Sequence, residues 1–399
     1  MQRESTGTQL QFLGAAGVVT GSKTLLKTDK YSILIDCGLF QGNESERKLN
    51  RIKQLPFKPS ALDAVILTHG HLDHSGYLPV LVKKGYEGAV YATPPTRDIT
   101  EVILRDSAKI QKETAAENNR ISGKDRKKEK PLYRKKHVKK TMRLFKTSPD
   151  EEWIELNQDI RFRFVKSGHI LGSASIELIC NGATFFFSGD VGQQEPLILD
   201  PPTRIAQADY LVLESTYGDK LHDASVSPYQ ALQDVVNKTF EKGGSVIIPS
   251  FAVERAQEII LLLNNLMEEK SIPQLPIYLD TPMGINVTEL FQKHRSWHNL
   301  SDEECDSLTR NVHIVQRFAE TQQVLDENAP KSNVIVAGSG MATGGRVLYY
   351  LKHLVSDRKN TVLLVGHQAE GTRGYQMLHG ETTIEIDGEA HEVKAEIEK

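Results

Sequence analysis

The sequence has few cysteines and no long apolar run, and both absences narrow the classes of protein that fit. Only three cysteines occur in 399 residues, Cys37, Cys180 and Cys305. An odd number at wide spacing argues against a disulfide framework. No apolar run approaches the roughly 20 residues of a membrane span, and residues 1–5 lack the apolar core of a secretory signal. The composition therefore favours a soluble protein of a reducing cytoplasm, without a membrane partner.

The sequence also lacks a repeat of fixed period and a Gly/Ser-rich linker. At 399 residues the chain exceeds the usual size of one hydrophobic core, so we expect two domains. Strand-like runs separated by turns fill the first half, whereas strands and helices alternate after Asp190. This later spacing predicts a parallel sheet with covering helices. We expect the boundary near residue 205.

Charge is nearly balanced overall but unevenly distributed. The net charge is −3, yet residues 120–146 contain 13 Lys or Arg against two acids. This block has two interpretations, which stay open from the sequence alone. It is either a solvated helical insertion or a contact surface for a phosphate backbone, with Tyr133 and His137 available to stack on bases.

The most informative segment is a cluster of polar residues directly after the apolar run 64–67. His69, His71, Asp73 and His74 lie within six residues. A buried strand that delivers ligands onto the loop at its end is a rigid way to build a metal site. Imidazole and carboxylate groups without a thiolate favour zinc in a hydrolytic role.

The pattern H-x-H-x-D-H resembles the signature of the metallo-β-lactamase superfamily. Three further segments match in the expected order: 31–36, which ends in Asp36; 167–173, which contains His169; and 187–190, which ends in Asp190. The resemblance implies two zinc ions. It places His69, His71 and His169 on one ion, Asp73 and His74 on the other, Asp190 as a bridge between them, and Asp36 as a support behind the ligands.

Four later segments resemble the β-CASP insertion, which marks nucleic-acid-processing members of this superfamily. They are 213–219, 249–257, 280–283 and 338–346. The resemblance implies an α/β fold, in which a metallo-β-lactamase αββα sandwich carries an inserted β-CASP domain. The expected domains are 1–205, 206–358 and an incomplete return to the first domain over 359–399. The resemblance also implies catalytic roles for Asp73, Asp190 and Glu214, the last as the acidic residue of the first segment, which would orient a partner in proton transfer.

A glycine-rich turn over 338–345 follows a strand-like run and precedes a helical one. Exposed backbone N–H groups at a helix start favour anions. Ser339, Gly340 and Arg346 are therefore candidates for contact with an RNA phosphate. Close helix–strand packing explains the glycines equally well, and pairing with a structural carboxylate is the alternative for Arg346.

The resemblance also implies two further histidine motifs beyond the point at which this sequence ends. One of them would complete the second zinc site, so we expect that zinc to be held more weakly. His367, His379 and His391 lack the context of those motifs. We therefore assign none of the three to the site.

These observations lead to one main hypothesis and two alternatives. The main hypothesis is a zinc-dependent ribonuclease that cleaves single-stranded RNA, as endonuclease, 5′-exonuclease or both, in RNA processing or decay. One alternative is a DNA-processing β-CASP nuclease, and the other is an RNA-binding scaffold with little or no activity. The resemblance also allows a homodimer.

Overall fold

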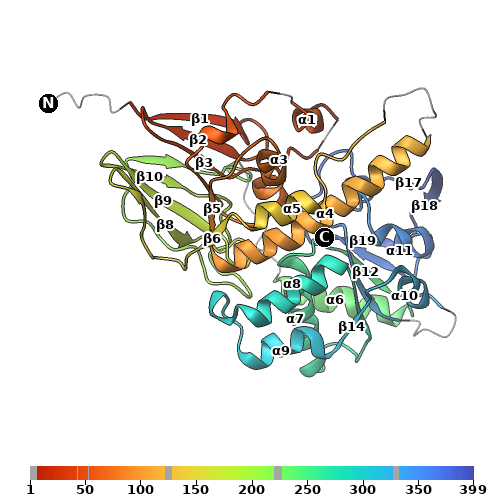
Figure 1. Ribbon diagram of the computed structural model, residues 1–399. Coiled ribbons are helices and arrows are strands. Elements are labelled where there is room, and N and C mark those ends of the chain that lie inside the picture. The colour runs from red at the N-terminus through yellow and green to blue at the C-terminus, as the bar shows by residue number, and fades with distance from the viewer. Residues whose placement is uncertain (1–6, 43, 53, 122–127, 220–226, 327–331) are drawn as a thin grey trace. The chain divides into compact units, whose positions relative to one another are not determined.

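The computed structural model describes residues 7–399 except 43, 53, 122–127, 220–226 and 327–331. The chain divides into two compact units, Met1–Asp219 and Lys220–Lys399 (Figure 1). No helix among the described residues is both long and apolar enough to cross a membrane.

The first unit contains two β-sheets that share one apolar layer. The first sheet follows chain order: β1 (Gln9–Gly14), β2 (Lys23–Lys27), β3 (Ser32–Ile35), β4 (Ala64–Ile66), β5 (Ala89–Ala92) and β6 (Phe145–Thr147). The second has the order β11-β10-β9-β8-β7, from β7 (Ile154–Asn157), β8 (Ile160–Lys166), β9 (Ala174–Cys180), β10 (Ala183–Phe187) and β11 (Tyr210–Val212). Ile33 and Ile35 pack in one cluster with Phe162 and Phe164. Side chains alternate along a strand, so Leu34 faces the opposite side.

Helices cover that opposite side of the first sheet. They are α3 (Leu78–Lys83), α4 (Pro94–Ile121) and α5 (Lys135–Met142), which lie next to one another beside this sheet in Figure 1. Leu34 and Val65 of the sheet share a buried cluster with Leu81, Leu104 and Val138 of these helices. The shorter elements of this unit are α1 (Glu44–Leu49), η1 (Pro59–Ala61) and α2 (Leu72–Ser75).

The second unit is built on a parallel sheet, as the strand–helix alternation predicts. Its strand order is β14-β13-β15-β12-β16-β19, and every pairing in it is parallel. The strands are β12 (Val246–Pro249), β13 (Ile277–Asp280), β14 (Val312–Ile314), β15 (Val334–Ala337), β16 (Thr361–Leu363) and β19 (Glu396–Glu398). The central strands β12 and β15 are buried along their whole length, which is typical of a parallel sheet covered on both faces.

Helices and one hairpin complete the second unit. The helices are α6 (Pro228–Glu241), α7 (Arg255–Glu268), α8 (Pro282–Lys293), η2 (Arg295–Trp297), α9 (Asp302–Arg310), α10 (Phe318–Gln323), α11 (Val347–Leu354) and α12 (Arg373–Leu378). The hairpin joins β17 (Thr383–Ile386) to β18 (Glu389–Glu392). Its turn residues Asp387 and Gly388 have φ values of 54° and 79°, as a two-residue Asp-Gly turn requires.

The division of the chain differs from the expected domains at two places. Strand β11 pairs with β10 and so belongs to the first unit, beyond the expected boundary at 205. Residues 359–399 lie in the second unit, because β16 pairs with β12 and β19 pairs with β16. β11 also differs from the buried strand that its apolar sequence predicts: it is an edge strand, and Tyr210, Leu211 and Leu213 are 55%, 55% and 62% exposed.

The described part of the basic segment is folded and packed. Helix α5 buries Val138, Thr141 and Met142. Tyr133 is fully buried, and its hydroxyl donates to the Ser107 hydroxyl at 2.8 Å. The prediction that Tyr133 can stack on bases is therefore wrong. Residues 122–127 of the segment lie outside the described residues.

Candidate metal centre

Two parallel strands deliver the first group of predicted ligands to one edge of a sheet. Strands β3 and β4 run parallel, and their carboxyl ends lead into Asp36 and into the segment 68–74. The two loops pack tightly, because a Cβ on Gly38 would lie 1.4 Å from the backbone oxygen of Asp73. Only glycine fits there. The sequence spacing and this close packing together place His69, His71, Asp73 and His74 around one point.

Two loops of the second sheet bring His169 and Asp190 to the same point. The Ser173 hydroxyl accepts hydrogen bonds from the backbone N–H groups of His169 (2.9 Å) and Ile170 (3.1 Å), which holds the β8–β9 loop in a tight turn. Gly192, in the loop after β10, donates its N–H to the oxygen of Ser167 at 2.8 Å. This bond ties the loop that carries Asp190 to the loop that carries His169.

Three imidazoles converge at spacings that suit a metal ion. The Nδ1 atom of His71 lies 3.1 Å from Nε2 of His69 and 3.1 Å from Nε2 of His169. With an oxygen of Asp190, these ligand atoms all lie within 4.8 Å of one another. Tetrahedral zinc with bonds of about 2.0–2.1 Å needs ligand atoms about 3.4 Å apart. The spacing therefore fits the predicted set of three histidines and one carboxylate.

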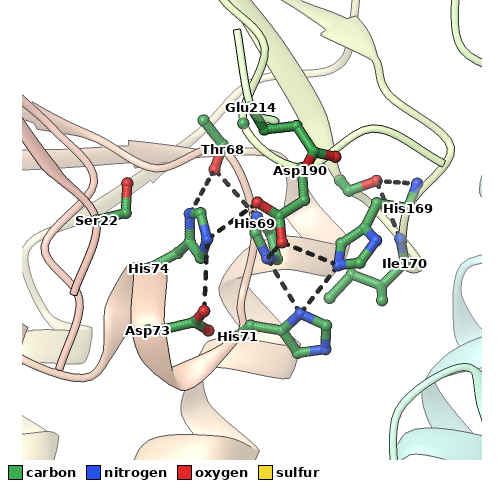
Figure 2. Close-up of polar contacts among 12 residues, drawn as sticks. Ser22, Thr68, His69, His71, Asp73, His74, His169, Ile170, Asp190 and Glu214 are labelled. Carbon is green, nitrogen blue, oxygen red and sulfur yellow. Dashed lines mark hydrogen bonds and ion pairs between the residues drawn. The ribbon is translucent and has the colours of Figure 1, made fainter. Parts of the chain in front are cut away.

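The carboxylate of Asp190 faces two groups of ligand atoms, as Figure 2 shows. Its Oδ2 lies 3.4 Å from Nε2 of His169 and 3.8 Å from Nε2 of His69. Its Oδ1 lies 3.2 Å from Nε2 of His74, which is itself 3.8 Å from Oδ2 of Asp73. Asp190 therefore stands between a histidine-rich group and a smaller group made by Asp73 and His74.

Asp36 stands behind the cluster and orients His74. Its Oδ2 lies 2.8 Å from Nδ1 of His74, so Nε2 of the same ring points toward Asp190. Asp36 also accepts the backbone N–H of Thr68 at 2.8 Å and the hydroxyls of Thr68 and Ser22 at 3.0 and 3.2 Å. A carboxylate that fixes the far nitrogen of a histidine is a common support for a metal ligand. Sequence reasoning missed Ser22 and Thr68, although Thr68 directly precedes the motif.

The three converging histidines are held in the neutral form. Burial, together with the neighbouring imidazoles, lowers the pKa of His69 well below its usual value and that of His71 to about 3. Burial also lowers the pKa of His169. A neutral imidazole keeps the lone pair that a metal requires, so these side chains are ready to coordinate without first losing a proton.

The other side of the cluster has the opposite electrostatic character. Burial disfavours charge on His74, but Asp36, Asp190 and Asp73 outweigh it and hold the pKa of His74 well above its usual value. Burial likewise acts against ionisation of Asp190, yet the adjacent His74 holds the pKa of that carboxyl well below its usual range. Three carboxylates lie around this one imidazole, so the site attracts positive charge. A divalent cation balances the negative charge of the carboxylates more fully than a single proton does.

Glu214 lies beside the cluster and braces the loop that follows Asp190. Its Oε1 accepts the backbone N–H of Val191 at 3.0 Å, and its Oε2 accepts that of Thr216 at 3.3 Å. Its own N–H donates to the Ser188 hydroxyl at 3.0 Å. The sequence places Glu214 just after a strand, as it places Asp36, and the structure adds that its carboxylate is tied to the backbone next to Asp190.

The predicted phosphate-binding residues lie in the second unit and make mainly internal contacts. The Ser339 hydroxyl accepts the N–H groups of Thr343 (3.1 Å) and Gly344 (3.3 Å). A Cβ on Gly340 would lie 2.9 Å from the ring of Phe251, so this glycine permits close packing. The sequence left close packing open as the alternative to anion binding.

Arg346 belongs to a buried polar network around Asp280. Its guanidinium pairs with Asp280 and donates to the backbone oxygens of Val315 (2.8 Å) and Gln316 (2.6 Å). Asp280 is completely buried and also accepts the hydroxyls of Tyr350 (2.6 Å) and Thr321 (2.7 Å). The structure thus shows the alternative in which Arg346 pairs with a structural carboxylate. Sequence reasoning identified the 280–283 segment but missed this network, whose members are far apart in the chain.

Comparison with known proteins agrees with this architecture. The sequence model of the metallo-beta-lactamase superfamily matches residues 16–250, and that of the Beta-Casp domain matches residues 256–377. A solved structure of a protein of unknown function from Enterococcus faecalis V583 is similar in fold alone. Its TM-score is 0.50 at 12% identity, over 93% of this chain and 84% of that one.

Relatives of known name cover almost the whole chain. Ribonuclease TTHA0252 of Thermus thermophilus is 34% identical over 390 residues, which are 96% of this chain and 85% of that protein. The RNase J-like protein of Methanocaldococcus jannaschii is 32% identical, over 94% of this chain and 82% of that protein. Transcription termination factor FttA of Methanosarcina mazei is 34% identical, over 94% of this chain but only 58% of that protein. The chain therefore belongs to the β-CASP ribonuclease family of the metallo-β-lactamase superfamily.

Proposed function

We propose that the chain is a zinc-dependent ribonuclease that hydrolyses phosphodiester bonds of single-stranded RNA in the cytoplasm. The observation that carries the proposal is the position of Asp190, whose two oxygens face two different groups of ligand atoms. Family membership makes the protein a hydrolase, and the metallo-β-lactamase fold implies a divalent metal. The proposal adds the identity and number of the metal ions and the nature of the substrate.

Two groups of donors would hold the two proposed zinc ions, and the first of them has ligand atoms within 4.8 Å of one another. His69, His71 and His169 with Oδ2 of Asp190 would hold one ion. Asp73 and His74 with Oδ1 of Asp190 would hold the other. This second group offers one nitrogen and two carboxylates, so we expect it to bind zinc more weakly than the first.

The zinc ions, when bound, would supply a nucleophile from water at neutral pH and balance the negative charge of the phosphate. The protein groups prepare that chemistry. The lowered pKa values keep His69 and His71 free of protons, so these two rings do not repel a cation. Asp36 fixes the ring of His74, and Glu214 fixes the backbone beside Asp190, from which it would orient a partner in proton transfer.

RNA is the favoured substrate because relatives that cover most of this chain are named as ribonucleases. We propose single-stranded RNA, cut internally or from the 5′ end. Ser339 and Gly340 stay as proposed phosphate contacts, through the turn that they help to build. The contacts of Arg346 favour a supporting role behind that turn.

The test is cleavage of a 5′-end-labelled single-stranded RNA in the presence of added zinc, with a DNA of the same sequence in parallel. We expect RNA cleavage by the unmodified chain and a loss of about 10³-fold or more in the Asp73→Ala and Asp190→Asn variants. Asp159→Asn is the matched control, because Asp159 lies in the turn between β7 and β8. RNA that is bound but not cut would instead indicate a scaffold. Equal cleavage of the RNA and of the DNA would indicate a nuclease without RNA preference.

A further inference from the structure

Helix α5 has one buried side and one strongly basic side. Val138, Thr141 and Met142 are buried, and Val138 and Met142 belong to the core cluster beneath the helix. The exposed side carries four lysines, which are Lys135, Lys136, Lys139 and Lys140. They form two pairs separated by one helical turn, or about 6 Å along the axis. The tertiary packing therefore presents these charges together on a rigid element.

Neighbouring cations extend this surface, which we call the α5 basic face. Arg134 and Arg143 flank the helix, and both are exposed. Lys83, at the end of α3, donates to the backbone oxygen of Leu132 at 3.2 Å, just before α5 begins. The α5 basic face comprises Lys83, Arg134, Lys135, Lys136, Lys139, Lys140 and Arg143.

Few acids neutralise the α5 basic face. Within the described part of the chain, Lys135, Lys136 and Lys139 have no acidic side chain within 4.0 Å, and Lys140 only reaches the exposed Glu87 at 4.0 Å. Residues 128–146 contain nine Lys or Arg and one acid, Glu129. Glu129 already forms an ion pair with Arg51 at 2.7 Å. A merely solvated surface usually mixes charges of both signs.

The neighbouring helix α4 shows that mixed pattern. Arg105 pairs with Glu101 at 2.5 Å and Arg120 pairs with Glu117 at 2.7 Å. These two helices of the same unit thus differ, and of the two it is α5 that keeps its described cations together without acids between them. The protein as a whole has a net charge of −3, so this concentration is local.

We propose that the α5 basic face, which shares no residue with the candidate metal ligands, binds the phosphate backbone of the RNA. The inference rests on the proposed RNA substrate but not on cleavage. Lysines are flexible point charges, which suit contact with successive phosphates regardless of base sequence. A membrane surface fits less well, because insertion of a helix into lipid requires an apolar side, and the apolar side of α5 is buried in the core.

The experiment replaces the four α5 lysines with glutamine in one variant, Lys135→Gln, Lys136→Gln, Lys139→Gln and Lys140→Gln. A control variant removes the same charge from the same unit at four exposed lysines, Lys27, Lys30, Lys48 and Lys58. Both are made in the Asp190→Asn chain, so that binding is measured without turnover. The probe is a fluorescent single-stranded RNA of about 30 nucleotides, titrated from about 50 to about 200 mM salt.

We expect the α5 variant to bind RNA about tenfold or more weakly. The slope of the logarithm of its affinity against the logarithm of salt concentration should correspond to about three fewer phosphate contacts. The control variant should differ little from the parent, and circular dichroism should show both folded. Equal effects of the two variants, or no RNA binding by the parent, would overturn the proposal. Binding to vesicles of anionic lipid that depends on α5, with RNA binding unchanged, would also overturn it. Cleavage by the unmodified chain is measured separately, so failure of the nuclease proposal is recognised independently.

Discussion

The Nδ1 atom of His74 lies 2.8 Å from Oδ2 of Asp36, and both side chains are buried. This contact fixes one nitrogen of the ring and leaves Nε2 facing Asp190 at 3.2 Å. Asp36 itself has a φ of 59°, a left-handed conformation that Asp and Asn tolerate better than most residues. The residue type at position 36 therefore serves both the backbone turn and the orientation of His74.

Replacement of Asp36 by Asn should weaken metal binding without unfolding the chain. Asparagine tolerates the left-handed backbone, but it lacks the negative charge that holds His74. We expect the affinity of the Asp73–His74 group for zinc to fall by about 10–100-fold. Competition titration against a zinc chelator measures the change. Unaltered zinc affinity, with His74 still required, would show that Asp36 does not support the site.

Replacement of Glu214 by Gln should lower activity while zinc content stays the same. The carboxylate accepts two backbone N–H groups, and the amide of glutamine can accept only one of them, so a bond worth about 1.5–3 kcal/mol is lost. We expect kcat to fall by about 10–100-fold. Steady-state cleavage kinetics and metal analysis of the same preparation provide the two readouts. Loss of zinc from Glu214→Gln would instead assign it a role in metal binding.

The stability of the metal-free protein should depend on pH through the buried histidines. His69, His71 and His169 have lowered pKa values, so below about pH 6.5 the unfolded chain binds protons that the folded chain does not. Stability should therefore fall as the pH drops from about 6.5. His74 acts in the opposite sense: its raised pKa gives stability below about pH 6.5 that is lost as the pH rises through the folded value.

Thermal melting of chelator-treated protein between about pH 5 and pH 9 measures this dependence. His71→Gln should reduce the loss of stability in acid, because glutamine does not titrate. His353→Gln is the control, since His353 is exposed on α11. If His71→Gln lost as much stability in acid as the unmodified chain, the lowered pKa of His71 would be contradicted.

Replacement of Arg346 by Gln should destabilise the second unit. Asp280 is completely buried, and loss of its cationic partner leaves an uncompensated charge in the interior. Removal of one partner of such a pair costs about 3–5 kcal/mol, which denaturant unfolding would detect. Arg255→Gln is the control, because Arg255 pairs with Glu258 at 2.8 Å in a more exposed position. Weaker RNA binding at unchanged stability would show that Arg346 is a phosphate ligand after all.

Much of the fold could be predicted from local sequence patterns. The apolar runs 32–35 and 183–187 and the helical pattern 347–354 coincide with β3, β10 and α11. The Asp387-Gly388 turn was recognisable because its two residues are those that accept positive φ. These elements depend on short-range periodicity and turn chemistry, which a sequence displays directly.

Burial and pairing were harder to predict, because they depend on distant segments. The apolar run 210–213 was expected to be buried, yet β11 has a neighbour on only one side in its sheet. Tyr133 was expected to be available for stacking, but it fills the core next to Ser107. Residue type alone does not reveal which side of a sheet or helix a neighbour covers.

The sequence by itself determined the donor chemistry of the site: imidazoles and carboxylates placed at strand ends, where they are displayed on rigid loops. Only the tertiary structure decided how these donors divide, because His71 meets His169 across 98 positions of sequence and Asp36 meets His74 across 38. It likewise decided that Arg346 meets Asp280 in the interior, and that the α5 lysines share one exposed side. Those relationships arise from the packing of loops and helices that are remote in the chain. Local sequence patterns therefore cannot predict them.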